Sequence, residues 1–459
     1  MLFYDGIFLV FLVGLLLLSA LLGIGERSVR ARGLLLLSAS YLFYAAWDVR
    51  FLALIAGSTI VDYALAARMP GAAPGRRRAL LIASLCVNLG SLALFKYLDM
   101  GIETLNAIAG TALEPLALTL PVGISFFTFQ SMSYTIDVYR GQLEPEPDFG
   151  RFALFVSFFP QLVAGPIIRA ADFLPQVSRA LARPVHAASA AVPLFVFGLF
   201  KKVVVADQLG GIADPIFADP TAFAVGDRAL AALAFTGQIY CDFSGYTDMA
   251  LALCALFGFD FPLNFRSPYL ARGPQDFWRR WHISLSTWLR DYLYISLGGS
   301  RLGVGRTYVA LSLTMLLGGL WHGASWTFVL WGAFHGGLLV TGRLIGGPAL
   351  DHPLLSPLRW AFFLLLTILG WVIFRVDSMA QLGAMLDGLG SPAMPAHEFA
   401  WVVYIGLFYV ALEQLAAEYL RQRRGPWWIT LRYALAGVLL PLCFLLRPDR
   451  TPDFIYFQF

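Results

Sequence analysis

Hydrophobic runs long enough to cross a membrane recur along the whole chain. A membrane-spanning helix needs about 20 mostly apolar residues, and somewhat fewer where the bilayer thins. By this criterion the pattern predicts about eleven to twelve transmembrane helices. The apolar runs cover residues 7–24, 33–46, 51–67, 79–98, 118–138, 188–206, 229–257, 308–320, 327–340, 360–374, 401–420 and 427–446. We therefore expect an all-α polytopic membrane protein whose residues 1–459 form a single membrane-embedded domain.

Two further apolar stretches do not fit simple crossings. Residues 152–168 contain Pro160, Gly165 and Pro166 and lie between two segments assigned to the cytoplasmic side, which favours a re-entrant hairpin. Residues 277–295 place bulky aromatic side chains on one helical stripe and charged side chains opposite them. This second pattern predicts one amphipathic helix at the cytoplasmic interface.

The composition agrees with a membrane protein. Only 14% of the residues are charged, against about 25% in soluble chains. The net charge of +4 comes from arginines beside apolar runs, so it reports topology and does not indicate nucleic-acid binding. The four cysteines are scattered without a CxxC spacing, so neither disulfides nor a zinc site is indicated. The first apolar run lacks a basic segment before it and a cleavage site after it, so it is expected to remain as a span.

The basic loops predict the orientation, because short loops rich in lysine and arginine stay in the cytoplasm. Placing all of these loops inside the cell puts the N-terminus outside. The loop arginines are Arg27, Arg30, Arg32, Arg68, Arg76, Arg77, Arg78, Arg169, Arg179, Arg183, Arg421, Arg423 and Arg424.

The stretch GGLWHGASW, residues 318–326, sits between two apolar runs and places His322 at membrane depth. An ionisable group there is costly and usually faces a bundle interior or a watery cavity. Gly318, Gly319 and Gly323 make one unbroken helix improbable, so we expect a broken apex between two helices.

Three of the six histidines, His282, His322 and His335, fall between residues 277 and 340. A neutral imidazole is the natural general base near pH 7, which suits acyl transfer to a hydroxyl. We interpret His335 as a packing residue. The sequence contains no HExxH spacing, which would indicate a metal site, and no P-loop, GxSxG elbow or dinucleotide fingerprint.

Polar side chains also interrupt the apolar run at residues 229–257. Asp242, Ser244, Tyr246 and Asp248 are denser than helix packing usually requires, so we expect them to line a cavity that faces His322. Hydrogen bonding between helices without catalysis is the alternative. Arg375, at the end of another run, is interpreted as an arginine that extends to the interface.

Four stretches of the sequence together resemble the membrane-bound O-acyltransferases. They are YCDFSGYTDMA, DFWRRWHISLSTWLRDYLYISLGG, GGLWHGASWTFVLWG and the closing IYFQF. Within that family the resemblance is to the members that acetylate bacterial alginate. It implies helices around a thin central core with a cytoplasmic funnel, and it matches His322 and His282 to the two histidines of the family.

The resemblance implies a bacterial inner-membrane O-acetyltransferase. Acetyl-CoA or another acetyl carrier would be the donor substrate, with no permanently bound cofactor. The acetyl group would cross the membrane to an extracytoplasmic polysaccharide such as alginate, with a partner acetyltransferase and a polysaccharide synthesis complex. His322 would be the base or acyl-transfer residue, and His282 would position the donor. The expected tunnel residues are Trp321, Asp242, Ser244, Tyr246, Trp281 and Ser286.

Other functions stay open at this point. Teichoic acid, peptidoglycan or cellulose are alternative acceptors for the same chemistry. A polytopic transporter without acyl chemistry would carry two matched repeats, which the sequence does not display. A scaffold for a polysaccharide synthase would not need His322.

Overall fold

A computed structural model describes residues 1–22, 26–163, 165–182, 191–345, 356–388, 394–396, 398–420, 426–448 and 455. Across these residues the regular elements are helices, and none of them is a strand, which confirms the all-α class. Some residues used in the sequence argument lie outside this part: Arg183, Arg421, Arg423, Arg424 and all of the closing IYFQF except Ile455.

Within the described residues, six helical segments are long and apolar enough to span a membrane. The chain is therefore a membrane protein, and the larger number of crossings expected from the sequence remains a prediction. The six segments are Val49–Ala66, Pro74–Ala109, Trp326–Ile345, Ser356–Arg375, Ala400–Leu420 and Trp427–Leu445. A shorter apolar helix covers Gly6–Leu21.

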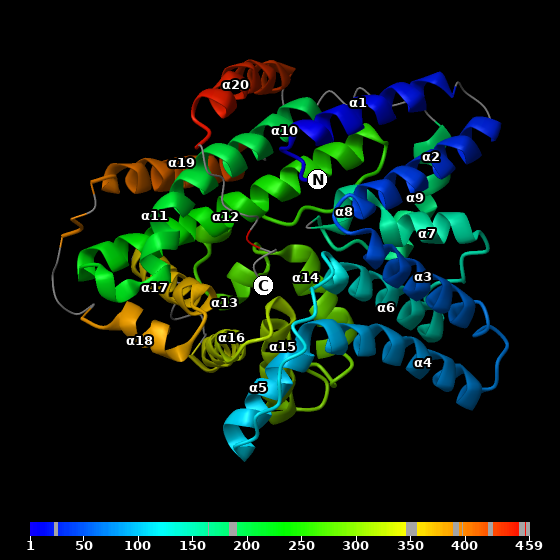
Figure 1. Ribbon diagram of the computed structural model, residues 1–459, viewed down its shortest axis with the longest axis horizontal. Helices are drawn as coiled ribbons and strands as arrows, with labels where there is room; N and C mark the ends of the chain where they lie inside the picture. Colours follow the sequence, from blue (N-terminus) through cyan, green and yellow to red (C-terminus); the bar gives the residue numbers. More distant parts are fainter. Residues whose placement is uncertain are drawn as a thin grey trace. The chain divides into compact units, whose positions relative to one another are not determined.

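The fold divides into two compact units. The first comprises residues 1–195 and 247–262, and the second comprises residues 196–246 and 263–459. The helices that lie wholly in the first unit are α1 (Gly6–Leu21), α2 (Glu26–Ala45), η1 (Val49–Phe51), α3 (Leu52–Ala66), α4 (Pro74–Leu92), η2 (Ala93–Tyr97), α5 (Leu98–Ala109), α6 (Ile124–Arg140), α7 (Phe149–Ser157), α8 (Phe159–Leu162) and α9 (Ala170–Ala182). Figure 1 labels α1 to α9, whose ribbons are coloured from blue to teal.

Helices α3, α4 and α6 of the first unit pack together around a buried polar cluster. The Asp62 carboxylate, fully buried, accepts hydrogen bonds from Ser84 Oγ at 2.6 Å and from Asn88 Nδ2 at 2.8 Å. Ser84 Oγ also lies 3.0 Å from Thr135 Oγ1, and Ser58 Oγ lies 3.3 Å from Asn88 Oδ1. One carboxylate thus ties three helices together through neutral partners.

The stretch predicted as a re-entrant hairpin forms the short helices α7 and α8, which break at Phe158. Pro160 lies in the first turn of α8, where its missing N–H costs nothing, whereas inside a continuous helix its ring would clash with the preceding turn. Every described residue from Phe152 to Val163 is buried. The broken shape agrees with the sequence interpretation; whether the stretch re-enters the membrane remains a prediction.

The second unit holds the end of α10 (Ala191–Phe200) and most of α12 (Val225–Leu256), together with helices that lie wholly within it. The latter are η3 (Lys201–Ala206), α11 (Asp207–Ala218), η4 (Pro220–Ala222), η5 (Pro268–Leu270), α13 (Pro274–Trp278), α14 (Ile283–Trp288), η6 (Leu289–Tyr294), α15 (Val304–His322), α16 (Trp326–Ile345), α17 (Ser356–Arg375), α18 (Met379–Leu386), α19 (Ala400–Leu420) and α20 (Pro426–Leu445).

The single amphipathic helix expected over residues 277–295 is wrong. The stretch is divided among α13, α14 and the π-helical η6, with a break at residues 279–282. His282 has φ 43° and ψ 55°, a left-handed conformation that ends one helix before the next begins. The periodic pattern of aromatic residues continues across the break, so periodicity alone could not reveal it.

The broken apex expected around His322 is confirmed. Helix α15 ends at His322, Gly323 is extended at φ −160° and ψ 152°, and α16 begins at Trp326. The two helices pack closely because small residues lie between them: a Cβ on Gly319 would overlap the Phe328 carbonyl oxygen, and one on Gly332 would overlap that of Met315. Gly319 therefore serves packing, and Gly323 carries the break.

Candidate functional site

His322 lies at the C-terminal end of α15 among aromatic side chains. Its ring centroid is 5.0 Å from that of Trp321, 5.1 Å from Trp331 and 5.3 Å from Phe374. All three contacts are edge-on, and the histidine side chain is only 5% exposed. The break at Gly323 thus ends the helix inside an apolar shell contributed by α15, α16 and α17.

His282 is held by Asn264, which lies in the loop before η5. The ring Nδ1 is 3.2 Å from Asn264 Oδ1, and the same oxygen accepts hydrogen bonds from the backbone N–H and the hydroxyl of Ser284. The backbone N–H of Ile283 donates to the Asn264 carbonyl at 2.9 Å. These bonds fix the left-handed turn at His282.

The same contacts determine the tautomer of His282. The Ser284 N–H can only donate, so the Asn264 atom that it meets must be the amide oxygen. That oxygen carries no hydrogen, so His282 Nδ1 must donate to it, which leaves the lone pair on Nε2. Burial lowers the pKa of His282 to about 3, so the ring is neutral at pH 7.

The structure brings His282, His322 and Trp321 together. The two imidazole centroids are 6.4 Å apart, and the His282 ring lies 6.0 Å from Trp321. The neighbouring Trp281 packs instead on Trp371, at 4.6 Å. Ser286 is tied to the turn, since its N–H donates to the His282 carbonyl at 2.9 Å and its hydroxyl to the Trp281 carbonyl at 3.3 Å.

The three expected tunnel residues of α12 are all buried, and one of them is engaged in an ion-pair cluster. Asp242 Oδ1 lies 2.7 Å from Lys202 Nζ, and its Oδ2 accepts the backbone N–H of Ile455 at 2.8 Å. Ser244 and Tyr246 are 1% and 0% exposed. A contact from this helix to the histidine pair is made by Phe243, whose ring lies 4.7 Å from that of His282.

Sequence reasoning missed two residues that organise this unit. Asn264 sets the tautomer of His282, and Lys202 on η3 bridges Asp242 and Asp207, the latter at 2.9 Å. Lys202 is 1% exposed, so its charge needs both carboxylates. Neither contact has a local sequence signal, because Asn264 lies 18 residues from His282 and Lys202 lies on a different helix from Asp242.

The structure also shows the surroundings of His335 and Arg375. His335 packs among aromatic rings, 4.6 Å from Trp331 and 5.2 Å from Trp278, as expected of a packing residue. Arg375 forms a 3.0 Å ion pair with Asp214 and lies over the ring of Phe217, partners that the sequence interpretation did not include. Its position at the membrane interface remains a prediction. A carboxylate on α11 gives this arginine a partner inside the protein.

The fold and site define a helical membrane protein with two neighbouring histidines enclosed by aromatic side chains. The family model described as "MBOAT, membrane-bound O-acyltransferase family" matches residues 142–347. The "probable alginate O-acetylase AlgI" of Pseudomonas aeruginosa is 47% identical over 394 residues, which cover 84% of this chain and 73% of that protein. The chain belongs to the membrane-bound O-acyltransferase family.

The chain is also similar to proteins that are named for other activities. The "peptidoglycan O-acetyltransferase" of Helicobacter pylori is 38% identical over 77% of this chain and 73% of its own length. The "teichoic acid D-alanyltransferase" of Streptococcus thermophilus is 32% identical over 48% of this chain and 56% of its own length. The chain is accordingly an O-acyltransferase.

Proposed function

We propose that this O-acyltransferase takes an acetyl group from a cytoplasmic donor and passes it across the membrane to a hydroxyl of an extracytoplasmic polysaccharide of the alginate type. The observation that carries the proposal is the pair of buried histidines, 6.4 Å apart, at two helix breaks. The choice of acetyl group and of alginate rests on the identity to alginate O-acetylases over most of the chain.

The chemistry is acyl transfer from a thioester to an alcohol. The acceptor hydroxyl loses its proton to a neutral imidazole as its oxygen attacks the acetyl carbonyl, and His322 takes this proton. The bond from carbonyl to sulfur breaks, an ester bond forms, and the thiolate recovers the proton. Acetyl-CoA supplies the thioester, and no permanently bound cofactor is needed.

His282 positions the donor in this proposal. Asn264 fixes its tautomer and its ring orientation, so Nε2 presents a lone pair in a defined direction. A hydrogen-bond acceptor held in this way orients a donor or its leaving thiol more precisely than a freely rotating ring. Because both histidines are buried, the substrates must reach them through a passage.

We propose that this passage is lined by Trp321, Trp281, Ser286, Asp242, Ser244 and Tyr246. The salt bridge from Lys202 holds Asp242 in place, so in the proposal this carboxylate shapes the wall and takes no proton from the substrate. The wider arrangement is eleven to twelve transmembrane helices around a thin core with a cytoplasmic funnel. The chain acts as one functional unit in the inner membrane, with the N-terminus outside.

The partners follow from the direction of transfer. An acetyl group that leaves the membrane on the outer side needs an acceptor there. We propose that this is the polysaccharide hydroxyl or an extracytoplasmic acetyltransferase within a polysaccharide synthesis complex. Teichoic acid, peptidoglycan and cellulose are the alternative acceptors, and the relatives from Helicobacter and Streptococcus support the first two of these classes. A transporter without acyl chemistry would move solute and consume no acetyl-CoA.

The test supplies acetyl-CoA labelled in the acetyl group to one face of liposomes that contain the purified protein, with alginate on the other face. The expected result is release of free CoA and appearance of label on the opposite side. His322→Gln should stop both, while the matched control His335→Gln, which is also buried and also lies against Trp331, should retain them. Solute flux without CoA release would contradict the proposal, as would equal loss in the two variants.

A further inference from the structure

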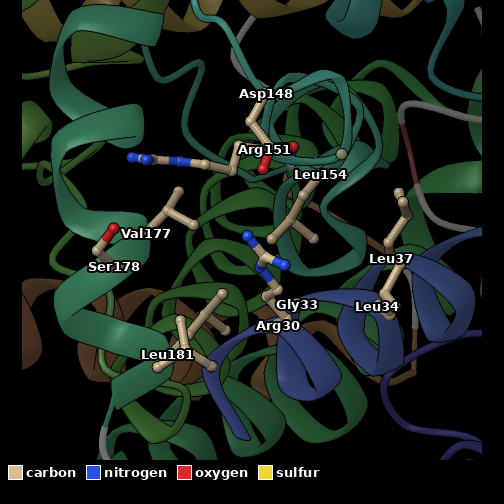
Figure 2. A pocket seen from close by; sticks show the side chains of 12 residues that line it. Arg30, Gly33, Leu34, Leu37, Asp148, Arg151, Leu154, Val177, Ser178 and Leu181 are labelled. Atoms are coloured by element: carbon tan, nitrogen blue, oxygen red, sulfur yellow. The ribbon is translucent and has the colours of Figure 1, made fainter. Parts of the chain in front are cut away.

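The first unit contains a cavity of about 230 Å³ between α2, α7 and α9. It is not part of the histidine site, whose residues all belong to the second unit. Figure 2 shows Arg30 reaching into the cavity from α2, with Asp148 and Arg151 coming from the N-terminal end of α7. The proposed acyl transfer gives this cavity no role.

The polar end of the cavity carries both signs of charge. Arg151 is already engaged, because its guanidinium donates to the Leu174 carbonyl at 2.8 Å and lies 3.7 Å from the Glu146 carboxylate. Asp148 Oδ1 accepts the backbone N–H of Arg151 at 3.1 Å and so caps α7. In the part of the chain that the structure describes, no carboxylate forms an ion pair with Arg30, so its guanidinium is available to a ligand.

The remaining walls are apolar. Leu37, Leu154 and Leu181 line the cavity, and Leu34 on α2 is 63% exposed. An exposed leucine beside a charged cavity suits a molecule that continues from a polar head into the hydrocarbon of the bilayer. Cavities that enclose a whole small ligand hold about 300–1,000 Å³, so this smaller one fits the head of a longer molecule.

We propose that this cavity binds a phospholipid with an ethanolamine head group. The phosphate meets Arg30, since guanidinium and phosphate form charge-assisted hydrogen bonds. The ammonium meets the carboxylate of Asp148, and an acyl chain runs along Leu34 and Leu37.

Charge complementarity separates this lipid from its rivals. The carboxylate of Asp148 repels a head group that carries only negative charge, such as phosphatidylglycerol, and it also repels the several phosphates of CoA. A choline head group keeps the positive charge but has no N–H to donate to Asp148. The ethanolamine head group satisfies Arg30 and Asp148 together.

The test is native mass spectrometry of the purified full chain in detergent, with equal amounts of phosphatidylethanolamine, phosphatidylglycerol and phosphatidylcholine. The wild type should retain phosphatidylethanolamine preferentially. Arg30→Gln should lower its retention at least about tenfold, because a hydrogen-bonded charge is removed. Asp148→Asn still caps α7, and it should remove the preference among the three lipids.

Two matched controls lie on α2 and α9, which both contribute to the cavity wall. Arg27→Gln on α2 and Asp172→Asn on α9 change exposed charges that do not line the cavity, so both should bind lipid as the wild type does. If Arg30→Gln does not fold, Arg30→Lys keeps the charge without the planar fork and should bind about as selectively but more weakly.

Equal retention of the three lipids by the wild type would overturn the proposal. So would unchanged retention in Arg30→Gln, or displacement of the lipid by CoA at equal concentration. The readout is binding, so it does not depend on whether the acyl-transfer proposal is correct.

Discussion

Asp62 in the first unit and Asp242 in the second are both carboxylates removed from water, yet they are stabilised by different chemistry. Asp62 accepts hydrogen bonds from the Ser84 hydroxyl and the Asn88 amide, both on α4, and neither partner carries a charge. Asp242 is held by the ammonium of Lys202, which also pairs with Asp207. The first arrangement joins helices through neutral groups, whereas the second is an ion cluster.

The histidine pair differs from both of these polar clusters. The rings of His282 and His322 lie against aromatic side chains, and Asn264 orients the first of them. Ion pairs and hydrogen bonds to a buried carboxylate hold helices together, whereas a neutral imidazole is the group suited to accept and return a proton near pH 7. Asp62 and Asp242 therefore belong to clusters that hold helices together, whereas we propose His282 and His322 for catalysis.

The largest expected effect is on catalysis in the second unit. His322→Gln should lower polysaccharide acetylation in cells by about 100- to 10,000-fold, the usual contribution of a general base. The amount of protein in the membrane should stay the same, because glutamine fills most of the same volume. NMR measures the acetyl content of the polysaccharide, and an immunoblot of the membrane fraction measures the amount of protein. Acetylation within twofold of wild type would remove His322 from the mechanism.

The ion cluster should show the largest effect on stability. Lys202→Met leaves Asp207 and Asp242 buried without their cation, which costs about 3–5 kcal/mol of stability. The triple variant with Asp207→Asn and Asp242→Asn should recover most of this loss, because no buried charge remains. Thermal unfolding in detergent gives the comparison. A Lys202→Met protein as stable as wild type would show that the cluster does not depend on this ammonium.

The neutral cluster in the first unit should respond more weakly. Ser84→Ala removes the hydroxyl that donates to Asp62, so we expect a loss of about 1–3 kcal/mol in stability and no change in turnover per folded molecule. Ser91→Ala, on the same helix, removes a hydroxyl that bonds only within its own helix and should change stability by less than about 0.5 kcal/mol. Equal effects of the two variants would contradict the role of the cluster.

The orienting amide should affect the transfer rate of the molecules that remain folded. Asn264→Ala removes the acceptor of His282 Nδ1, and we expect a decrease of about 10- to 100-fold in the transfer rate. Asn264→Asp keeps an acceptor oxygen and should restore part of that rate relative to the alanine variant. Rates on purified protein, divided by the folded fraction, provide the measurement. An aspartate variant no better than alanine would argue against control of the tautomer.

The sequence predicted what depends on local pattern. The apex at His322 was expected because glycines interrupt two apolar runs, and the break does fall at Gly323. The break at His282 was not expected, because helical periodicity continues through WRRWHIS and the turn is imposed by Asn264 from a separate loop. The pairing of Asp242 with Lys202 and of Arg375 with Asp214 likewise arises from tertiary contacts.

The most direct measurement compares purified wild type, His322→Gln and Ser84→Ala in one experiment that records both the thermal midpoint and the release of thiol from acetyl-CoA. We expect His322→Gln to lose thiol release and keep its midpoint, whereas Ser84→Ala should lose several degrees and keep the release. If activity and midpoint fall in parallel in both variants, the distinction between the histidines that we propose for catalysis and the structural polar cluster is contradicted.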